Sequence, residues 1–208
     1  MKGRRGVLDI IACCFATGQA RRQPDAVVRG DEAAVRSWLE RGGRANTAHE
    51  YGEVTGVTLL MDAAGQGHER VADLLLRHDA EATVQNSKGY TALMRAATEG
   101  HERVVDLLLR GGAEIELQDS DGFTALMRAA QQGHERVVEL LLQHGAEINL
   151  RDRDGRNPLI HAAINGHNNV LTKQGFNHVA VCQRATECLS TYRVIEQDVG
   201  KLTGRIFE

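Results

Sequence analysis

The hydrophobic and polar positions of this chain repeat with a period of 33 residues. Residues 86–118 and 119–151 are identical at 23 of 33 positions without a gap, where unrelated sequences would share about two. A fixed period of this length is typical of stacked repeats, in which each unit buries its apolar faces against its neighbours. The pattern therefore predicts an all-α repeat solenoid rather than a single globular core.

Each unit predicts a turn, a short helix, a second turn and a second helix. In residues 86–118, Gly89 lies in the polar turn and Thr91 can cap the first helix. Gly100 separates that helix from a second one, which we expect over about 102–110. The second helix is apolar on most sides, so neighbouring units should cover it.

These residues carry a family resemblance. Gly-x-Thr-Ala-Leu-Met-x-Ala-Ala-x-x-Gly-His, followed by Val-Val-x-Leu-Leu-Leu-x-x-Gly-Ala, resembles the ankyrin repeat, which has the same period and a Thr-Pro-Leu-His motif. Ala92 and Ala125 stand where that family prefers Pro, and Met94 and Met127 where it prefers His. The resemblance covers about 26–171 and implies a helix-turn-helix stack with β-hairpin-like loops and possible terminal capping helices.

The repeat register predicts the organisation of the chain. We expect an N-terminal segment at 1–25, a repeat domain at 26–175 and a divergent C-terminal tail at 176–208. The repeat domain divides into a partial repeat 26–52, repeats 53–85, 86–118 and 119–151, and an incomplete repeat 152–175.

Two local departures from the register have structural meaning. Four extra residues fall within 47–55 at a hairpin tip, and insertions in stacked repeats map to loops. Asp79 replaces the Gly (Gly112, Gly145) that ends the second helix elsewhere, in the left-handed conformation that Gly tolerates best. We expect this replacement to cost about 1 kcal/mol.

The two terminal segments allow alternatives. Residues 1–25 combine basic residues with a short apolar run, which favours a capping helix; a secretory signal or a mitochondrial targeting peptide remains open. In 152–175 the second helix should stop near Leu171, because Lys173-Gln174-Gly175 replaces the triple Leu. The tail has apolar residues three or four apart, which predicts an amphipathic capping helix; a disordered or divergent tail is the alternative.

Composition narrows the classes of function. A net charge of −3 with both signs interspersed gives no reason to expect nucleic acid or an anionic membrane as the main partner. No apolar run is long enough to span a bilayer. The four cysteines lack zinc-ligand spacing, which favours reduced thiols and a cytoplasmic location, with the nucleus an alternative. We expect a monomer.

The sequence contains no recognisable catalytic, phosphate-binding or metal-binding motif. His68, His101, His134 and His167 follow a Gly in each unit, which favours a structural role over metal binding. The chain has no phosphate-binding loop, nucleophile elbow or His-Glu-x-x-His motif. We therefore expect no catalytic, cofactor-binding or metal-binding residues. An enzyme with its residues in a terminal segment, or a nucleic-acid binder that uses the basic N-terminus, is the alternative.

The resemblance implies a non-catalytic module that binds a protein partner through a concave face, built from hairpin tips and first helices. Contacts in that family come from positions that vary between copies. Tyr90 and Phe123 occupy successive tips, with Arg156 next, and aromatic and Arg side chains often dominate binding energy; alternatively, both rings merely pack the tips together. The candidate partner-binding residues are Tyr51, Lys88, Tyr90, Thr98, Glu99, Asp121, Phe123, Gln131, Gln132, Arg153 and Arg156.

Overall fold

A computed structural model describes residues 22–167 and residue 170. Most of the 1–25 segment, the expected helix end near Leu171 and the whole of the tail lie outside the described residues. Predictions for them stay predictions.

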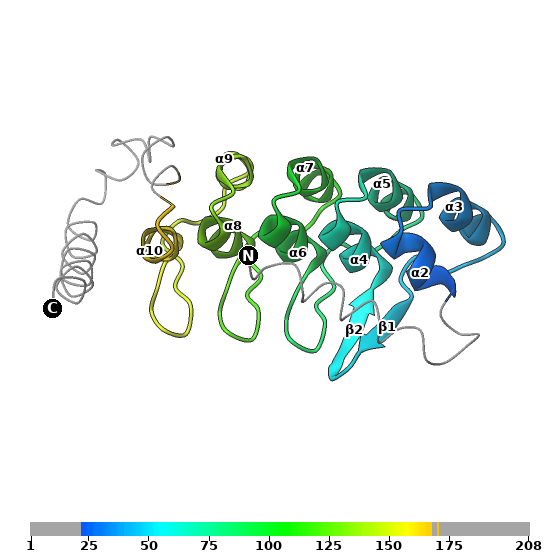
Figure 1. The fold of residues 1–208 in the computed structure, drawn as a ribbon, viewed down its shortest axis with the longest axis horizontal. Helices are drawn as coiled ribbons and strands as arrows, with labels where there is room; N and C mark the ends of the chain where they lie inside the picture. The colour runs from blue at the N-terminus through cyan, green and yellow to red at the C-terminus, as the bar shows by residue number, and fades with distance from the viewer. Residues whose placement is uncertain (1–21, 168–169, 171–208) are drawn as a thin grey trace, which may run out of the picture.

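The described residues form an all-α stack with two rows of short helices (Figure 1). One row holds the first helix of each repeat and the other holds the second. Each helix packs against the equivalent helix of the neighbouring repeat. The first row consists of α2 (Arg22–Val28), α4 (Leu59–Gln66), α6 (Ala92–Glu99), α8 (Ala125–Gln132) and α10 (Pro158–Ile164). The second row consists of α3 (Glu32–Glu40), α5 (Glu69–Arg77), α7 (Glu102–Arg110) and α9 (Glu135–Gln143).

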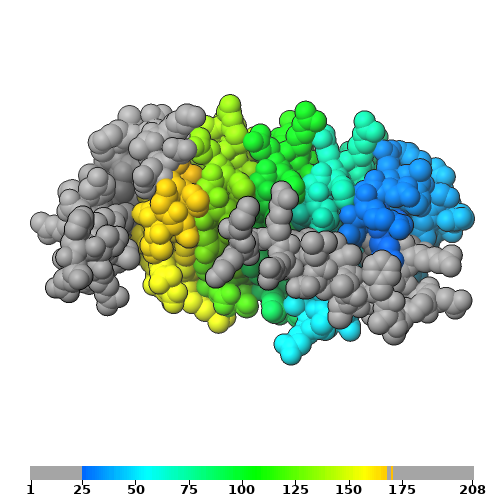
Figure 2. Space-filling view, in the orientation of Figure 1, coloured from blue at the N-terminus to red at the C-terminus, as the bar shows by residue number. Residues whose placement is uncertain are grey.

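The apolar core runs along the whole stack instead of gathering at one centre. Leu60, Leu93 and Leu126 recur one repeat apart and are each 1% exposed. The paired alanines of the first helices are also buried, and their small size allows close approach of neighbouring helices. In Figure 2 the repeats lie side by side in sequence order along the long axis. The predicted repeat solenoid is confirmed.

Local sequence signals set the helix ends as predicted. Thr91 caps α6 through its hydroxyl, which accepts a hydrogen bond from the backbone N–H of Met94 at 3.1 Å. Thr58, Thr124 and Asn157 cap α4, α8 and α10 in the same way. Gly100 ends α6 with a φ of 78°. The cap and the second helix expected at 102–110 are confirmed.

The second helices are followed by a residue with positive φ. This residue is Gly112 after α7 (φ 84°), Gly145 after α9 (φ 91°) and Asp79 after α5 (φ 61°). Among the described residues, Asp79 is the only non-Gly residue with a positive φ. The Asp79 carbonyl accepts a hydrogen bond of 3.0 Å from Nδ2 of Asn46, one repeat earlier. The predicted left-handed conformation of Asp79 is confirmed.

The four inserted residues lie within a β-hairpin. β1 (Ala48–Tyr51) pairs antiparallel with β2 (Val54–Thr58), with Ala48 opposite Thr58 and Tyr51 opposite Val54. The register shifts between His49 and Tyr51. This hairpin projects beyond the loops of the later repeats in Figure 1. The insertion therefore lengthens one tip without disturbing the stack.

The first repeat is more complete than its sequence indicated. Residues 26–52 match only the second half of a repeat, yet α2 precedes α3 and packs against α4. Pro24 lies in the first turn of α2, where a missing N–H is tolerated. The helix pair was not evident because α2 begins before the legible register at Ala26.

Candidate protein-interaction surface

The hairpin tips and the adjacent side of the first helices form one continuous surface, which we call the hairpin face. Its tips are joined by backbone hydrogen bonds between successive repeats. Ser87 N–H donates to Thr55 O at 2.9 Å, Ser120 N–H to Lys88 O at 2.9 Å, and Arg153 N–H to Asp121 O at 3.1 Å. The spacing of the tips is therefore fixed by the backbone.

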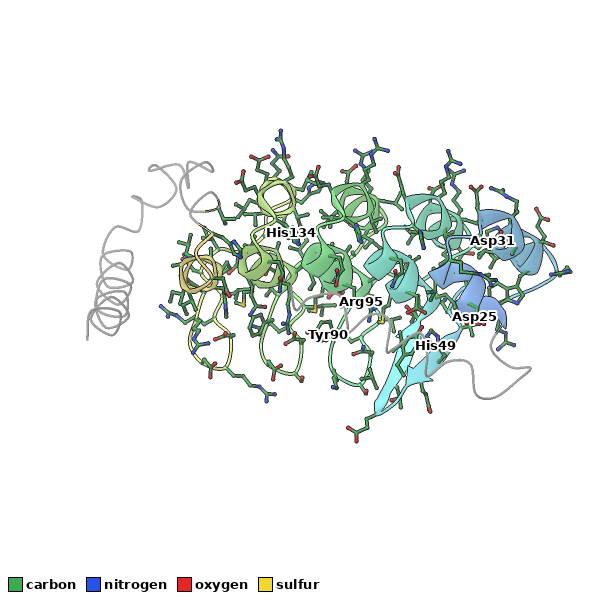
Figure 3. The ribbon with its side chains drawn as sticks, in the orientation of Figure 1. Asp25, Asp31, His49, Tyr90, Arg95 and His134 are labelled. Carbon is green, nitrogen blue, oxygen red and sulfur yellow. The ribbon has the colours of Figure 1, made fainter. Side chains whose placement is uncertain are left out.

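A column of histidines joins the repeats between the two rows of helices (Figure 3 labels His134). Nε2 of His134 lies 2.9 Å from the carbonyl oxygen of Thr98 in the preceding repeat. His68, His101 and His167 contact the equivalent carbonyls at 2.8, 3.2 and 3.0 Å. A carbonyl oxygen only accepts, so Nε2 carries the proton in each ring. These contacts support the structural role that the spacing predicted.

The glycine before each histidine makes room for the next ring. A Cβ on Gly100 would lie 2.6 Å from Nδ1 of His134, and a Cβ on Gly67 would lie 2.6 Å from Nδ1 of His101. Both glycines also have positive φ. The Gly-His pair is thus required for close contact between repeats as well as for the turn.

A second column consists of buried polar residues at the start of each tip. Oδ1 of Asp119 accepts hydrogen bonds from the N–H groups of Asp121 and Phe123 at 2.9 and 3.0 Å. Asn86 and Asp152 bind their own tips in the same way. Each of these three tips is thus closed by one side-chain oxygen.

The second carboxylate oxygen of each aspartate binds a cationic or imidazole side chain on the first helix. Oδ2 of Asp119 accepts from Arg128, whose side chain is 13% exposed. Oδ2 of Asp152 lies 2.7 Å from Nε2 of His161. Burial strengthens such charge-assisted contacts. Sequence reasoning missed both pairs, although a constant spacing of nine residues was visible.

The β-hairpin carries the same kind of pair, but here the imidazole lies on the tip and the carboxylate lies on the first helix. His49 occupies β1 and Asp62 occupies α4, with His49 Nε2 3.0 Å from Asp62 Oδ2. The 13-residue separation exceeds nine by the four inserted residues. The Asp62 side chain is 2% exposed, and neither atom forms a well-aligned hydrogen bond. The His49 ring also meets Tyr51 edge-on, with centroids 4.7 Å apart.

Arg128 holds the two predicted tip aromatics together. Its Cζ lies 4.9 Å from the centroid of Tyr90 and 4.0 Å from that of Phe123. Phe123 also contacts the His161 ring, with centroids 4.6 Å apart. Both rings therefore pack the tips together, and both remain partly accessible.

The environment of Tyr90 favours its protonated form. Burial raises the pKa of the phenol above 10, and the nearby Asp119 and Asp121 add to this shift. The positive charges of Arg128 and Arg95 oppose it. Tyr90 is therefore a neutral hydrogen-bond donor near pH 7.

The remaining candidates divide by exposure. Lys88, Glu99, Asp121, Gln132, Arg153 and Arg156 are exposed. Thr98 and Gln131 are half-buried, and the Thr98 hydroxyl donates to the Met94 carbonyl at 2.8 Å. Tyr51 is half-buried, because its ring packs edge-on against His49 and also against the core.

The described part of the chain, residues 22–167 and 170, contains no group of three His, Cys, Asp or Glu side chains placed to hold a metal ion. It also contains no helix with the length and apolarity needed to cross a bilayer.

The family model described as ankyrin repeats (3 copies) matches residues 25–119 and 104–173, which together are more than half of the chain. No curated protein matches it. Proteins of this family are generally protein–protein interaction modules. The paired helices, the projecting tips and the family match agree, and the chain belongs to the ankyrin repeat family.

Proposed function

We propose that this protein is a non-catalytic interaction module that binds a protein partner through the hairpin face, the concave side of the stack. One observation carries the proposal. The tip pairs that differ between repeats are exposed, while the apolar residues that recur in the first helices are buried in the frame. Ser87-Lys88, Ser120-Asp121 and Arg153-Asp154 are the variable exposed pairs.

The mechanism is preorganisation. The tip-to-tip hydrogen bonds and the histidine column hold the variable side chains at a fixed spacing before any partner arrives. Little backbone entropy is then lost on binding, which leaves more of the contact energy as affinity. We further propose that the protein acts as a monomeric scaffold in the cytoplasm.

The candidate residues differ in their value for testing this proposal. Tyr90 and Phe123 contact Arg128, so replacing them by Ala would disturb the frame as well as the surface. Lys88, Asp121 and Arg153 are exposed and lie at three successive tips. Charge reversal at these three positions changes the surface and leaves the helix packing intact.

The test uses peptides selected from a displayed random library against the full chain. A hairpin-face variant (Lys88→Glu, Asp121→Arg, Arg153→Glu) should weaken binding of the selected peptides by about tenfold or more. The matched control reverses three exposed arginines on the second helices: Arg70, Arg103 and Arg136, which are 87%, 84% and 71% exposed. Weaker binding by the control alone would assign the surface to the second helices and reject the proposal.

A further inference from the structure

Arg95 and Arg128 occupy the same position in successive repeats and differ in their partners. Arg128 binds Asp119 at the start of its own tip. The residue equivalent to Asp119 in the repeat of Arg95 is Asn86, which carries no charge. Within residues 22–167 and 170, no carboxylate lies within ion-pair distance of Arg95. Its guanidinium is therefore a cation without an acid partner in that part of the chain.

The preceding repeat provides space for this guanidinium. Arg95 lies against Gly65 of α4, where a Cβ would come within 2.9 Å of its Nε and 3.0 Å of its Nη2. The equivalent positions in the next two repeats carry Thr98 and Gln131. Gly65 is helical, so no turn requires glycine there. Its effect is to leave room for Arg95.

Tyr90 supplies a second donor on the same side of α6 as Arg95. Figure 3 places Arg95 and Tyr90 on the side of α6 that faces the tips. The charge of Arg95 acts on the Tyr90 phenol, which remains protonated near pH 7. A guanidinium and a phenolic O–H together suit a carboxylate, which accepts two hydrogen bonds.

The surrounding charges favour a single carboxylate over a polyanion. Glu99, one turn further along α6, and Asp121, on the next tip, are both exposed. Their repulsion of an anion grows with its charge, so it opposes a chain of phosphates more strongly than a single carboxylate.

We propose that Arg95 and Tyr90, with the space left by Gly65, form a site that recognises an Asp or Glu side chain of the protein partner. This proposal rests on the proposed function, because it assigns the partner's chemistry at one point of the hairpin face. Asn86 is the residue that keeps the site unoccupied by the protein's own acid.

Selection from a displayed random peptide library against the full chain tests the site. The wild-type chain should enrich peptides with Asp or Glu at one fixed position. Arg95→Glu should enrich Lys or Arg at that position, and Arg95→Gln should remove the preference. Arg103→Glu makes the same charge reversal on the second helices and should give the wild-type result.

Two further variants retain Arg95. Asn86→Asp supplies the acid found in the next repeat and should weaken binding of an acidic peptide on the order of tenfold. Gly65→Ala places a methyl group where the guanidinium lies. It should also weaken binding of the acidic peptide. Both variants should keep the wild-type helicity, so a folding defect cannot imitate the effect.

The outcomes separate this proposal from the general one. Peptides that bind the hairpin face without an acidic preference, or an acidic preference that survives Arg95→Glu, would overturn the carboxylate site alone. Arg95-dependent binding of a random single-stranded oligonucleotide would assign the site to phosphate and overturn it as well. Selected peptides that ignore the hairpin face altogether would reject both proposals.

Discussion

The ring of His134 lies over Gly100 of the preceding repeat, and its Nε2 binds the Thr98 carbonyl at 2.9 Å. One histidine thus contacts the end of a first helix and the turn that follows it. The same arrangement recurs at each described junction between repeats. The glycine at this turn is needed both for its positive φ and for the space that the histidine ring occupies. An experiment can separate these two requirements.

Gly100→Ala should be more destabilising than Gly112→Ala. Both positions have positive φ, so each substitution costs about 1–2 kcal/mol for the left-handed backbone. At Gly112 a Cβ meets nothing within 4 Å, whereas at Gly100 it collides with His134. Loss of that histidine's hydrogen bond should add about 1 kcal/mol. Urea unfolding followed by circular dichroism measures the difference; equal costs would mean that the ring moves aside freely.

Asp79→Gly should raise the melting temperature. Asp79 holds a φ of 61°, which Gly adopts without strain, so the gain should be about 1 kcal/mol. The hydrogen bond from Asn46 uses the backbone carbonyl of Asp79 and survives the substitution. Calorimetry of both proteins gives the answer, and an unchanged or lower melting temperature would show that the Asp side chain itself stabilises the turn.

His49→Ala should destabilise the protein by about 2–4 kcal/mol, because it leaves the Asp62 carboxylate buried without a partner. Asp62→Ala in the same background should recover part of that loss. A double-mutant cycle on the free energy of unfolding should give a coupling of about 1–3 kcal/mol. Strictly additive single effects would mean that the two side chains do not interact.

Glu116→Gln should stabilise the protein slightly near pH 7. Burial, and secondarily the charge of Glu147, raise the pKa of Glu116 above 4.5, while the hydrogen bond from the Glu147 N–H lowers it. A carboxyl with a raised pKa in the folded state stabilises below 4.5 and loses that contribution as the pH rises through the folded pKa. The gain, a few tenths of a kcal/mol for this partly exposed group, should therefore vanish below pH 4.5. A gain that persists in acid would point to a different cause.

Gly65→Ala should raise the free energy of unfolding by up to about 1 kcal/mol, because Ala is the better residue within a helix. The new methyl group meets the flexible end of Arg95 and no backbone atom. Thermal unfolding of the two full chains compares them. A loss of stability would show that Gly65 is needed for helix packing, not for the position of Arg95.

The sequence predicted those features that depend on neighbouring residues. Thr91 before an apolar helix, Gly100 after it and the acid-first helix beginning at Glu102 are local signals, and each predicted its element. The histidine column was also predictable, because a residue that recurs in register must serve the frame.

The side-chain pairs were not predicted because they join positions in different elements. The Asp119–Arg128 and Asp152–His161 pairs share a spacing that aligned copies would have revealed. The His49–Asp62 pair was harder to find, because the insertion changes the spacing and because the acid lies on the helix instead of on the tip. The contact of Arg95 with Gly65 crosses between repeats, so no motif within one repeat contains it.

The backbone bonds between Thr55, Lys88, Asp121 and the following tips have a consequence for how this surface can change over evolution. They use main-chain atoms, so exposed tip side chains such as Lys88, Asp121 and Arg153 can be exchanged without breaking these bonds. New binding specificity can therefore arise one substitution at a time, because the backbone positions of the tips stay the same.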